Sequence, residues 1–559
     1  ADGELQPPLR DLVRGQVEAG LAGAIAEGRL PERPSDATDF ELVRPTQPGH
    51  GDFSANAALK LAGQLGRPPR DVAAAIAQGI ATGGQSPLAR VEVAGPGFIN
   101  LFLSPALIER AADEIRPLGA AYGRTAAAAR RVNVEFVSAN PTGPLHIGNA
   151  RGAFVGDVLC RVLAAAGHAV TREYYFNDFG GQVKALGGSV RAIRAGTPLP
   201  DDGYRGEYVR QMAAEVPPDI VAAAEAAGDA DAADWVYGRW ASEIQRGGIE
   251  ASLERLGVHF DVWTTESSIH DLGWVARGVE MLRESGHVYE QDGATWFRST
   301  HFGDDKDRVI YRSNGRPTYF AADIGYLVEK FSRGFDELIY VWGENHHGAV
   351  ARLVNAAGAM GHPREAVRVL LYSWVRFVRD GEPISMSKRS GEFVTLDDLI
   401  AEVGVDAVRW SFSSRTVTSG LDFDLELAKK QSDENPVYYV QYAHARICSI
   451  LRRAAEADLA PGASVRAALA DDDVALGLAK ELLQLPDVVR DAAGAHETQS
   501  ITAFATHLAT TFHGFYRDRR VIDADAPQMS AARLALVDAT RVTLANALGL
   551  LGISAPEQM

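Results

Sequence analysis

Cysteine is scarce in this chain, which has two cysteines among 559 residues. Cys160 and Cys448 lie far apart, each within a predicted helix, and neither belongs to a Cys-x-x-Cys pair or to a cluster of cysteine and histidine. This pattern argues against a structural zinc site. It also predicts a reducing compartment.

Long apolar runs are missing as well. No stretch reaches the ~18 apolar residues that a membrane-spanning helix needs. The first ten residues, ADGELQPPLR, lack the basic segment and apolar core of a secretory signal. We therefore expect a cytoplasmic protein without a membrane partner.

Positive charge is in deficit, because 56 Lys and Arg stand against 73 Asp and Glu, for a formal net charge of −17. Cations that neutralise phosphates supply most of the unselective affinity for nucleic acids, so this balance argues against an unselective nucleic-acid binder. An RNA held by local basic patches remains compatible with it.

The periodicity of apolar residues predicts a multidomain protein, and no repeat of fixed period indicates a solenoid. Strands and helices alternate in residues 116–375, the second of four regions. This alternation predicts an α/β domain with a parallel sheet, in which ligands bind at the carboxyl ends of the strands. The regions are a small α+β domain at 1–115, the α/β domain at 116–375, a connector at 376–430 and an all-helical domain at 431–559.

Inside the α/β region we expect strands at 132–136, at about 317–323 and at 337–342, with an antiparallel hairpin at 288–298. A helical insertion at about 190–265 contains the stretch VAAAEAAGDADAADW. Its low complexity predicts solvated helices rather than a functional site.

Residues 132–155 carry the first chemical motif. A strand at 132–136 is followed by a loop with glycine and proline, which opens into a helix. A helix that begins there offers unpaired backbone N–H groups and the positive end of its dipole to a phosphate. His146 and Asn149 lie on its first turn and add side-chain donors.

The second motif is MSKRSG at 386–391, after the strand-like VRVLLYSWVRFV and before a predicted helix near Leu396. Taken alone, it is a basic turn on a solvated loop.

Together the motifs resemble those of class I aminoacyl-tRNA synthetases. HIGN at 146–149 is similar to the HIGH motif, with Asn149 in place of the second histidine, and MSKRSG is similar to the KMSKS loop, with Ser385 in place of the first lysine. HIGN alone also occurs in other nucleotidyltransferases. Glu135, Asn140 and EYYFNDFGGQ from Glu173 narrow the resemblance to the arginyl-tRNA synthetase family, and it covers essentially the whole chain.

This resemblance implies a Rossmann-like catalytic domain at 116–375 and a connector at 376–430 that carries the KMSKS loop and contacts the tRNA stem. It implies an N-terminal domain that touches the tRNA elbow and a C-terminal anticodon-binding domain. The implied catalytic residues are His146, Asn149 and Lys388. The implied ATP-binding residues are His146, Gly148, Asn149, Gly343, Met386, Ser387 and Lys388, with ATP used as its Mg²⁺ complex and no tightly bound protein metal.

Arginine is the amino acid that the sequence favours. A guanidinium group prefers bidentate carboxylate partners, and the predicted architecture brings Glu135 and Asp323 to one pocket, where Tyr319 would stack on the guanidinium plane. Taken singly, Asp323 could instead cap a helix and Tyr319 could be core. The positions that the resemblance assigns to arginine are Glu135, Asn140, His146, Tyr319, Asp323 and His347.

Candidate tRNA contacts come from both ends of the chain. The motifs GDFSAN and GFIN resemble the family's N-terminal domain and single out Asn56 and Asn100. Tyr438, Tyr442 and Arg446 interleave aromatic rings with a cation, which is typical of contacts with unpaired bases but also of packing between helices.

The resulting prediction is a monomeric arginine–tRNA ligase that uses L-arginine, ATP and tRNA(Arg), and the resemblance implies that tRNA binds before arginine is activated. The alternatives are another class I ligase and a catalytically silent tRNA-binding paralogue. An acidic cluster at 304–307 is interrupted by Lys306, which favours a solvated turn over a metal site.

Changing Lys388 to alanine is expected to slow adenylate formation by about 10²-fold, because a charge-assisted contact that strengthens in the transition state is lost. ATP binding should weaken far less. Single-turnover activation with tRNA present measures the rate, and a rate equal to that of the unmodified enzyme would remove Lys388 from the mechanism.

Overall fold

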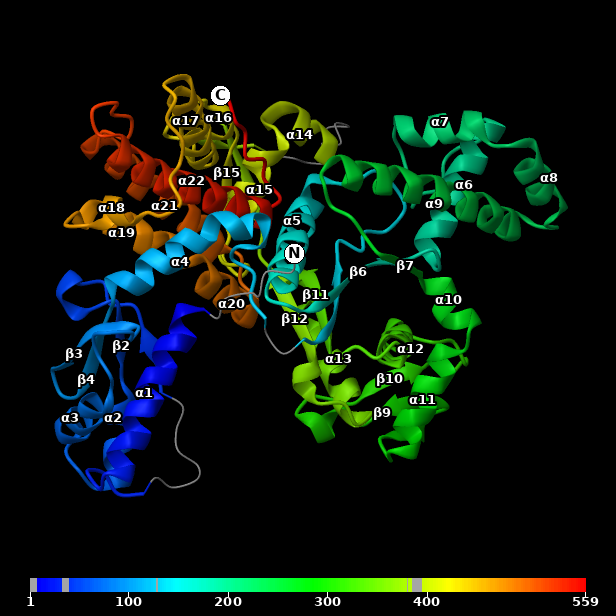
Figure 1. Cartoon of the computed structure of the whole chain (residues 1–559). Coiled ribbons are helices and arrows are strands. Elements are labelled where there is room, and N and C mark those ends of the chain that lie inside the picture. The colour runs from blue at the N-terminus through cyan, green and yellow to red at the C-terminus, as the bar shows by residue number, and fades with distance from the viewer. Residues whose placement is uncertain (1–7, 33–39, 127–128, 380, 385–394) are drawn as a thin grey trace.

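A computed structural model describes residues 8–32, 40–126, 129–379, 381–384 and 395–559 of the chain. Figure 1 shows three lobes around a central sheet: the N-terminal domain, the helical insertion α6–α9 and the C-terminal helices. Among the described residues, no helix is both long and apolar enough to cross a membrane.

The N-terminal domain packs helices against a four-stranded antiparallel sheet of order β1-β2-β4-β3. Phe53, Ile99 and Leu101 are fully buried in it. Its elements are α1 (Leu9–Ala26), β1 (Leu42–Val43), β2 (Phe53–Ala55), α2 (Ala57–Leu65), α3 (Pro69–Gly79), β3 (Leu88–Ala94), β4 (Phe98–Leu103) and α4 (Pro105–Leu118).

A five-stranded parallel sheet of order β12-β11-β5-β6-β7 forms the centre of the molecule. The strand order reverses between β5 and β11, so the loops that follow these two strands open a crevice at the carboxyl edge, where such sheets bind ligands. The strands are β5 (Arg131–Phe136), β6 (Ala169–Phe176), β7 (Val262–Thr265), β11 (Glu337–Gly343) and β12 (Val367–Tyr372). The predicted α/β class with a parallel sheet is confirmed.

The remaining elements of this part of the chain are α5 (Ala150–Ala165), α6 (Gly181–Ala195), α7 (Glu207–Glu215), α8 (Pro218–Ala226), α9 (Ala230–Arg255), α10 (Glu266–Asp271), α11 (Trp274–Glu284), β8 (Val288–Gln291), β9 (Ala294–Phe297), β10 (Arg308–Tyr311), α12 (Tyr319–Ser332) and α13 (His347–Ala359). The predicted hairpin is present as β8 and β9. The strand predicted at about 317–323 is wrong, because Tyr319 begins helix α12. Its aromatic and apolar start favoured a strand, but such a run fits a buried helix equally well, and nearly every residue from Phe320 to Lys330 is buried.

Strand β5 is buried on both faces. Phe136 packs against α5, where a side chain on Gly156 would come within 2.3 Å of its ring, so the helix approaches the strand closely only because residue 156 is glycine. On the other face Asn133 and Glu135 hydrogen-bond to Glu173 and Lys330. A central parallel strand with buried polar side chains requires such partners.

After the central sheet the chain forms a short three-stranded sheet and then a helical C-terminal domain. The predicted apolar stripes of this domain are buried at Leu478, Leu482, Phe504 and Leu508. The elements are β13 (Val375–Arg379), β14 (Glu382–Pro383), α14 (Leu396–Val403), α15 (Val405–Ser413), β15 (Leu421–Asp424), α16 (Leu425–Lys429), α17 (Pro436–Glu456), α18 (Arg466–Leu469), α19 (Asp473–Leu482), α20 (Leu485–Ala495), α21 (Gln499–Asp518) and α22 (Pro527–Leu550).

A buried ion pair joins these parts. Arg409 of α15 is 1% exposed and donates from Nη1 to Oδ2 of Asp157 in α5 at 2.8 Å. The same guanidinium donates to carbonyls of Leu256 and Gly257, after α9, and of Leu551, after α22. One side chain thus ties helix α5 of the central domain, the insertion and the C-terminal helices together.

Changing Asp157 to alanine is expected to destabilise the protein by about 3–5 kcal/mol, because it leaves the buried Arg409 cation without its carboxylate. The matched control is Asp422→Ala, which breaks a solvent-exposed bidentate pair with Arg376 and should leave the melting temperature nearly unchanged, because solvent screens such a pair. Apparent melting temperatures measure both, and equal melting temperatures for the two variants would contradict the prediction.

Candidate active site

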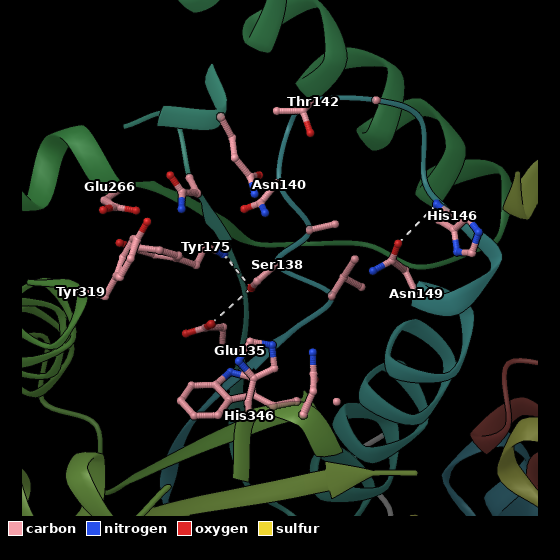
Figure 2. Close-up of a pocket in the computed structure, with 18 of the residues that line it drawn as sticks. Glu135, Ser138, Asn140, Thr142, His146, Asn149, Tyr175, Glu266, Tyr319 and His346 are labelled. Atoms are coloured by element: carbon pink, nitrogen blue, oxygen red, sulfur yellow. Dashed lines mark hydrogen bonds between the residues drawn. The ribbon is translucent and has the colours of Figure 1, made fainter. Parts of the chain in front are cut away.

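A pocket of about 1720 Å³ lies at the carboxyl edge of the central sheet (Figure 2). Its walls come from the loops after β5, β6 and β11, from α10, α12 and α13, and from residues 203–208 and Arg210 of the insertion. Thr395, the first described residue after the second sequence motif, also lines it. The volume exceeds that of most small-molecule sites, so two ligands fit side by side.

The loop after β5 leaves the strand through a strained turn. Val137 and Ser138 have φ angles of 66° and 40°, which non-glycine residues rarely adopt and which cluster at functional sites. Ser138 compensates for this strain, since its hydroxyl donates to Glu135 and accepts from the N–H of Tyr175 (Figure 2). The turn therefore directs the loop over the pocket.

Three further hydrogen bonds hold the same loop from outside. Tyr174 on β6 donates to the carbonyl of Ala139, Tyr208 on α7 donates to the carbonyl of Thr142, and the N–H of Leu396 donates to the carbonyl of Leu145, each at 2.9 Å. His146 also forms an antiparallel bridge with Thr395. Thr395 and Leu396, the first described residues after the second motif, therefore lie directly beside His146 and Leu145 of the first motif.

His146 and Asn149 close the first turn of the following helix as a capping box. Nδ1 of His146 accepts from the N–H of Gly148 at 3.0 Å, and Oδ1 of Asn149 accepts from the N–H of His146 at 3.2 Å. A neutral His146 ring consequently carries its proton on Nε2. Both side chains line the pocket as donors beside a helix N-terminus, as the sequence predicts.

Acidic side chains lie deeper in the pocket. Asp323 of α12 has no hydrogen bond or ion pair within the described part of the chain, and burial together with the charge of Glu135 raises its pKa to about 7. Burial likewise raises the pKa of Glu266, at the start of α10, to about 7. The pocket therefore combines a helix N-terminus, which offers hydrogen-bond donors, with carboxylates that an organic cation would neutralise.

Glu135 differs from the expected free carboxylate. Its Oε2 accepts from Nζ of Lys330 at 2.6 Å, and both side chains are almost wholly buried. Sequence analysis missed Lys330, and also Glu266 and the insertion residues on the pocket wall. Glu266 follows directly on β7, so the rule that ligands gather at the carboxyl ends of strands points to it.

The insertion was expected to form solvated helices only, but part of it also lines the pocket. Its low-complexity stretch does form helices α8 and α9, but the residues just before α7 line the pocket. The usable signal was GYRGEY at 203–208, where glycine and aromatic residues alternate with charge.

Some of the other predicted pocket residues line the pocket and some do not. Asn140, Tyr319 and Gly343 line the pocket, whereas Gly148 and His347 are not among its lining residues. His347 is exposed at the start of α13, and its neighbour His346 lines the pocket instead. Met386, Ser387 and Lys388 lie outside the described residues.

The candidate tRNA contacts also differ from one another. Asn100 is 4% exposed and accepts from Ser54, which leaves little of it for a ligand, and Asn56 hydrogen-bonds to Glu41. On α17 the rings of Tyr438 and Tyr442 stack, and the Arg446 guanidinium lies 5.1 Å from the Tyr442 ring centre. Tyr442 is 37% exposed, so this face offers both rings and a cation to solvent.

In the acidic cluster at 304–307, the carboxylates accept hydrogen bonds from neighbouring side chains. Arg308 donates to Asp304 through two nitrogens, and Asp307 accepts from Thr300 and Tyr289. Among the residues that the structure describes, no three His, Cys, Asp or Glu side chains are grouped to hold a metal ion.

Three family models match the chain. They describe an arginyl tRNA synthetase N terminal domain at 13–103, a class I tRNA synthetase (R) catalytic domain at 117–192 and 245–411, and a DALR anticodon binding domain at 440–559. The gap in the catalytic match falls within the insertion.

Curated relatives match over the full length. The arginine–tRNA ligase of Moorella thermoacetica is 46% identical over 98% of both chains, and that of Geobacillus thermodenitrificans is 43% identical over 100% of this chain and 99% of its own. A solved Campylobacter jejuni structure, described as a putative arginyl tRNA synthetase, is 32% identical with a TM-score of 0.73, over 82% of this chain and 100% of its own. Thermus thermophilus arginyl-tRNA synthetase shares the fold, with a TM-score of 0.77 and 24% identity over 98% and 100% of the two chains. The chain belongs to the arginyl-tRNA synthetase family of class I.

Proposed function

We propose that the pocket at the carboxyl edge of the central sheet binds arginine and ATP side by side. The chain is an arginine–tRNA ligase, and its substrates are arginine, ATP and tRNA. The observation that carries the assignment of the pocket is the joint presence of the HIGN turn and the unpaired Asp323 in one cavity. ATP enters as its Mg²⁺ complex, and arginyl-adenylate forms where the two ligands meet.

In the arginine subsite, Asp323 supplies the main charge for the guanidinium group. The Asp323 carboxylate lies on the pocket wall without a partner in the described part of the chain, so it can make the charge-assisted pair that a guanidinium favours. Glu266 adds a second carboxylate, and Tyr319, which is 77% exposed at the pocket mouth, can cover the ligand. Asn140 and His146 lie nearer the HIGN turn, on the side where the α-amino and carboxylate groups of arginine would meet ATP.

The ATP subsite is built on the helix that begins after Asn149. The backbone N–H groups of its first turn, the Asn149 amide and Nε2 of His146 are donors for phosphate oxygens. Gly343, at the carboxyl end of β11, lines the pocket on the neighbouring strand. Lys388 is proposed, from sequence, to meet the charge that leaves with pyrophosphate.

The reaction needs alignment more than covalent help. The arginine carboxylate attacks the α-phosphorus of ATP as pyrophosphate departs, and the resulting aminoacyl-adenylate passes arginine to the 3′ end of tRNA with release of AMP. Because no protein nucleophile takes part, the HIGN turn contributes by holding and stabilising phosphoryl charge.

We also propose the division of labour between domains. Tyr442 is exposed on α17, and Tyr438 and Arg446 beside it are partly exposed, so this face is placed for unpaired bases and supports an anticodon-binding role for residues 431–559. The region 1–115 is proposed to meet the tRNA elbow, with Asn56 better exposed than Asn100. The connector 376–430 follows the catalytic region 116–375 in sequence, carries the segment that includes Lys388, and is proposed to contact the tRNA stem.

Changing Asp323 to asparagine keeps the shape of the side chain and removes its charge. We expect the KM for arginine to rise about 10- to 100-fold, because a hydrogen-bonded ionic contact contributes about 1.5–3 kcal/mol, while the KM for ATP stays the same. Asp271→Asn, an exposed site on α10 outside the pocket, is the matched control. Aminoacylation assays with tRNA present measure both constants, and an unchanged arginine KM would refute this arginine site.

The pH dependence of arginine use follows from the same carboxylate. Burial and Glu135 raise the pKa of Asp323 to about 7, and only the ionised form attracts guanidinium. The kcat/KM for arginine should therefore fall as the pH drops through 7, by up to about tenfold per pH unit. Aminoacylation between pH 5.5 and 8.5 at saturating ATP gives the profile. Asp323→Asn should make the profile shallower and leave the contribution of Glu266, and a flat profile in the unmodified enzyme would contradict the prediction.

A further inference from the structure

Lys330 is a buried cation beneath the pocket. It lies two turns after Asp323 on α12 and its side chain is 0% exposed. Its Nζ donates to Glu135 at 2.6 Å and lies 4.2 and 4.1 Å from the ring centres of Tyr326 and Tyr340. Lysine is almost never buried so completely unless its charge is compensated. Here Glu135 and the two tyrosine rings compensate it, so a positive charge lies directly beneath the pocket.

A second ion pair lies beside the first and joins a buried carboxylate to a partly exposed guanidinium. Arg333 donates to both carboxylate oxygens of Glu173 on β6, at 2.7 and 2.9 Å. Glu173 also accepts from Thr264 and Tyr326. Two of the carboxylates on this floor therefore have their own cations, and Asp323 is left without an ion pair among the described residues. This uneven pairing determines how much positive charge a ligand has to supply.

We propose that Lys330 is a specificity-determining residue for arginine, because it holds the charge of Glu135 in an internal ion pair and leaves Asp323 as the carboxylate that the guanidinium completes. This inference rests on the proposed arginine site. Without Lys330, Glu135 and Asp323 would both be uncompensated, and their repulsion would favour a proton on one of them at neutral pH. That proton would remove the charge that selects a permanent cation.

Several other groups contribute to the field at Asp323. Arg352 of α13 lines the pocket and its charge favours the ionised form of Asp323, whereas Glu266 and Glu135 oppose it. A variant that removes the charge of Lys330 or of Glu135 changes one of the charges near Asp323, while the charges of Arg352 and Glu266 remain. The titratable and charged groups around the pair are Glu135, Glu173, Tyr175, Glu266, Asp323, Tyr326, Arg333, Tyr340 and Arg352.

The experiment compares three variants by the pH profile of kcat/KM for arginine in aminoacylation. Lys330→Met removes the cation and should move the midpoint up by about one pH unit or more, because the charge of Glu135 then acts on Asp323 unopposed. Glu135→Gln removes the anion and should move the midpoint down by a similar amount, because Lys330 then favours the ionised form of Asp323. The double variant Lys330→Met/Glu135→Gln should return the midpoint close to its original value.

General damage to the fold would not move the midpoint in opposite directions, so the sign separates a role in charge pairing from a structural one. Lys306→Met, at an exposed lysine, is the control for loss of a positive charge. If Lys330→Met fails to fold, the downward shift in Glu135→Gln and its reversal in the double variant still decide the question.

Two outcomes would overturn the inference in different ways. If Asp323→Asn leaves the arginine KM unchanged, the proposed arginine site fails and this inference fails with it. If Asp323→Asn raises that KM but the midpoints of Lys330→Met, Glu135→Gln and the double variant all coincide with that of the unmodified enzyme, only the role of Lys330 is wrong.

Discussion

Burial of strand β5 between two parallel neighbours is the constraint on which this molecule depends. Pairing with β6 on one side and β11 on the other places the loops after these strands at one edge. It also buries Asn133 and Glu135, which then need partners inside the protein. The partners come from α12 and β6, so the same requirement that stabilises the sheet also places charge under the pocket.

The sequence predicted the parts of the site that are local in the chain. The turn at His146–Asn149 is specified by residues next to one another, and the apolar stripes of the C-terminal helices follow from spacing alone. Helix α12 was mistaken for a strand because its first residues are aromatic and apolar. The Lys330–Glu135 pair joins residues 195 positions apart, and no local pattern specifies such a contact before the tertiary fold is known.

The insertion shows how composition can mislead. Its alanine-rich stretch predicted solvated helices, and α8 and α9 agree with that. The residues that line the pocket lie immediately before α7 and in its first turn, in a short segment whose composition is quite different. Tyr208 reaches from this lobe to the loop that carries His146, so a lobe that is separate in Figure 1 still forms part of the catalytic wall.

The hydrogen bonds at Ala139, Thr142 and Leu145 share one chemical property: in each, the loop offers a main-chain oxygen. A peptide carbonyl is present whatever amino acid occupies the position. Side-chain replacement at these three loop positions therefore spares the acceptor, whereas loss of the hydroxyl of Tyr174 or Tyr208 deletes a donor outright. The shape of the loop therefore depends largely on donors from distant segments of the chain and less on the side chains of the loop itself.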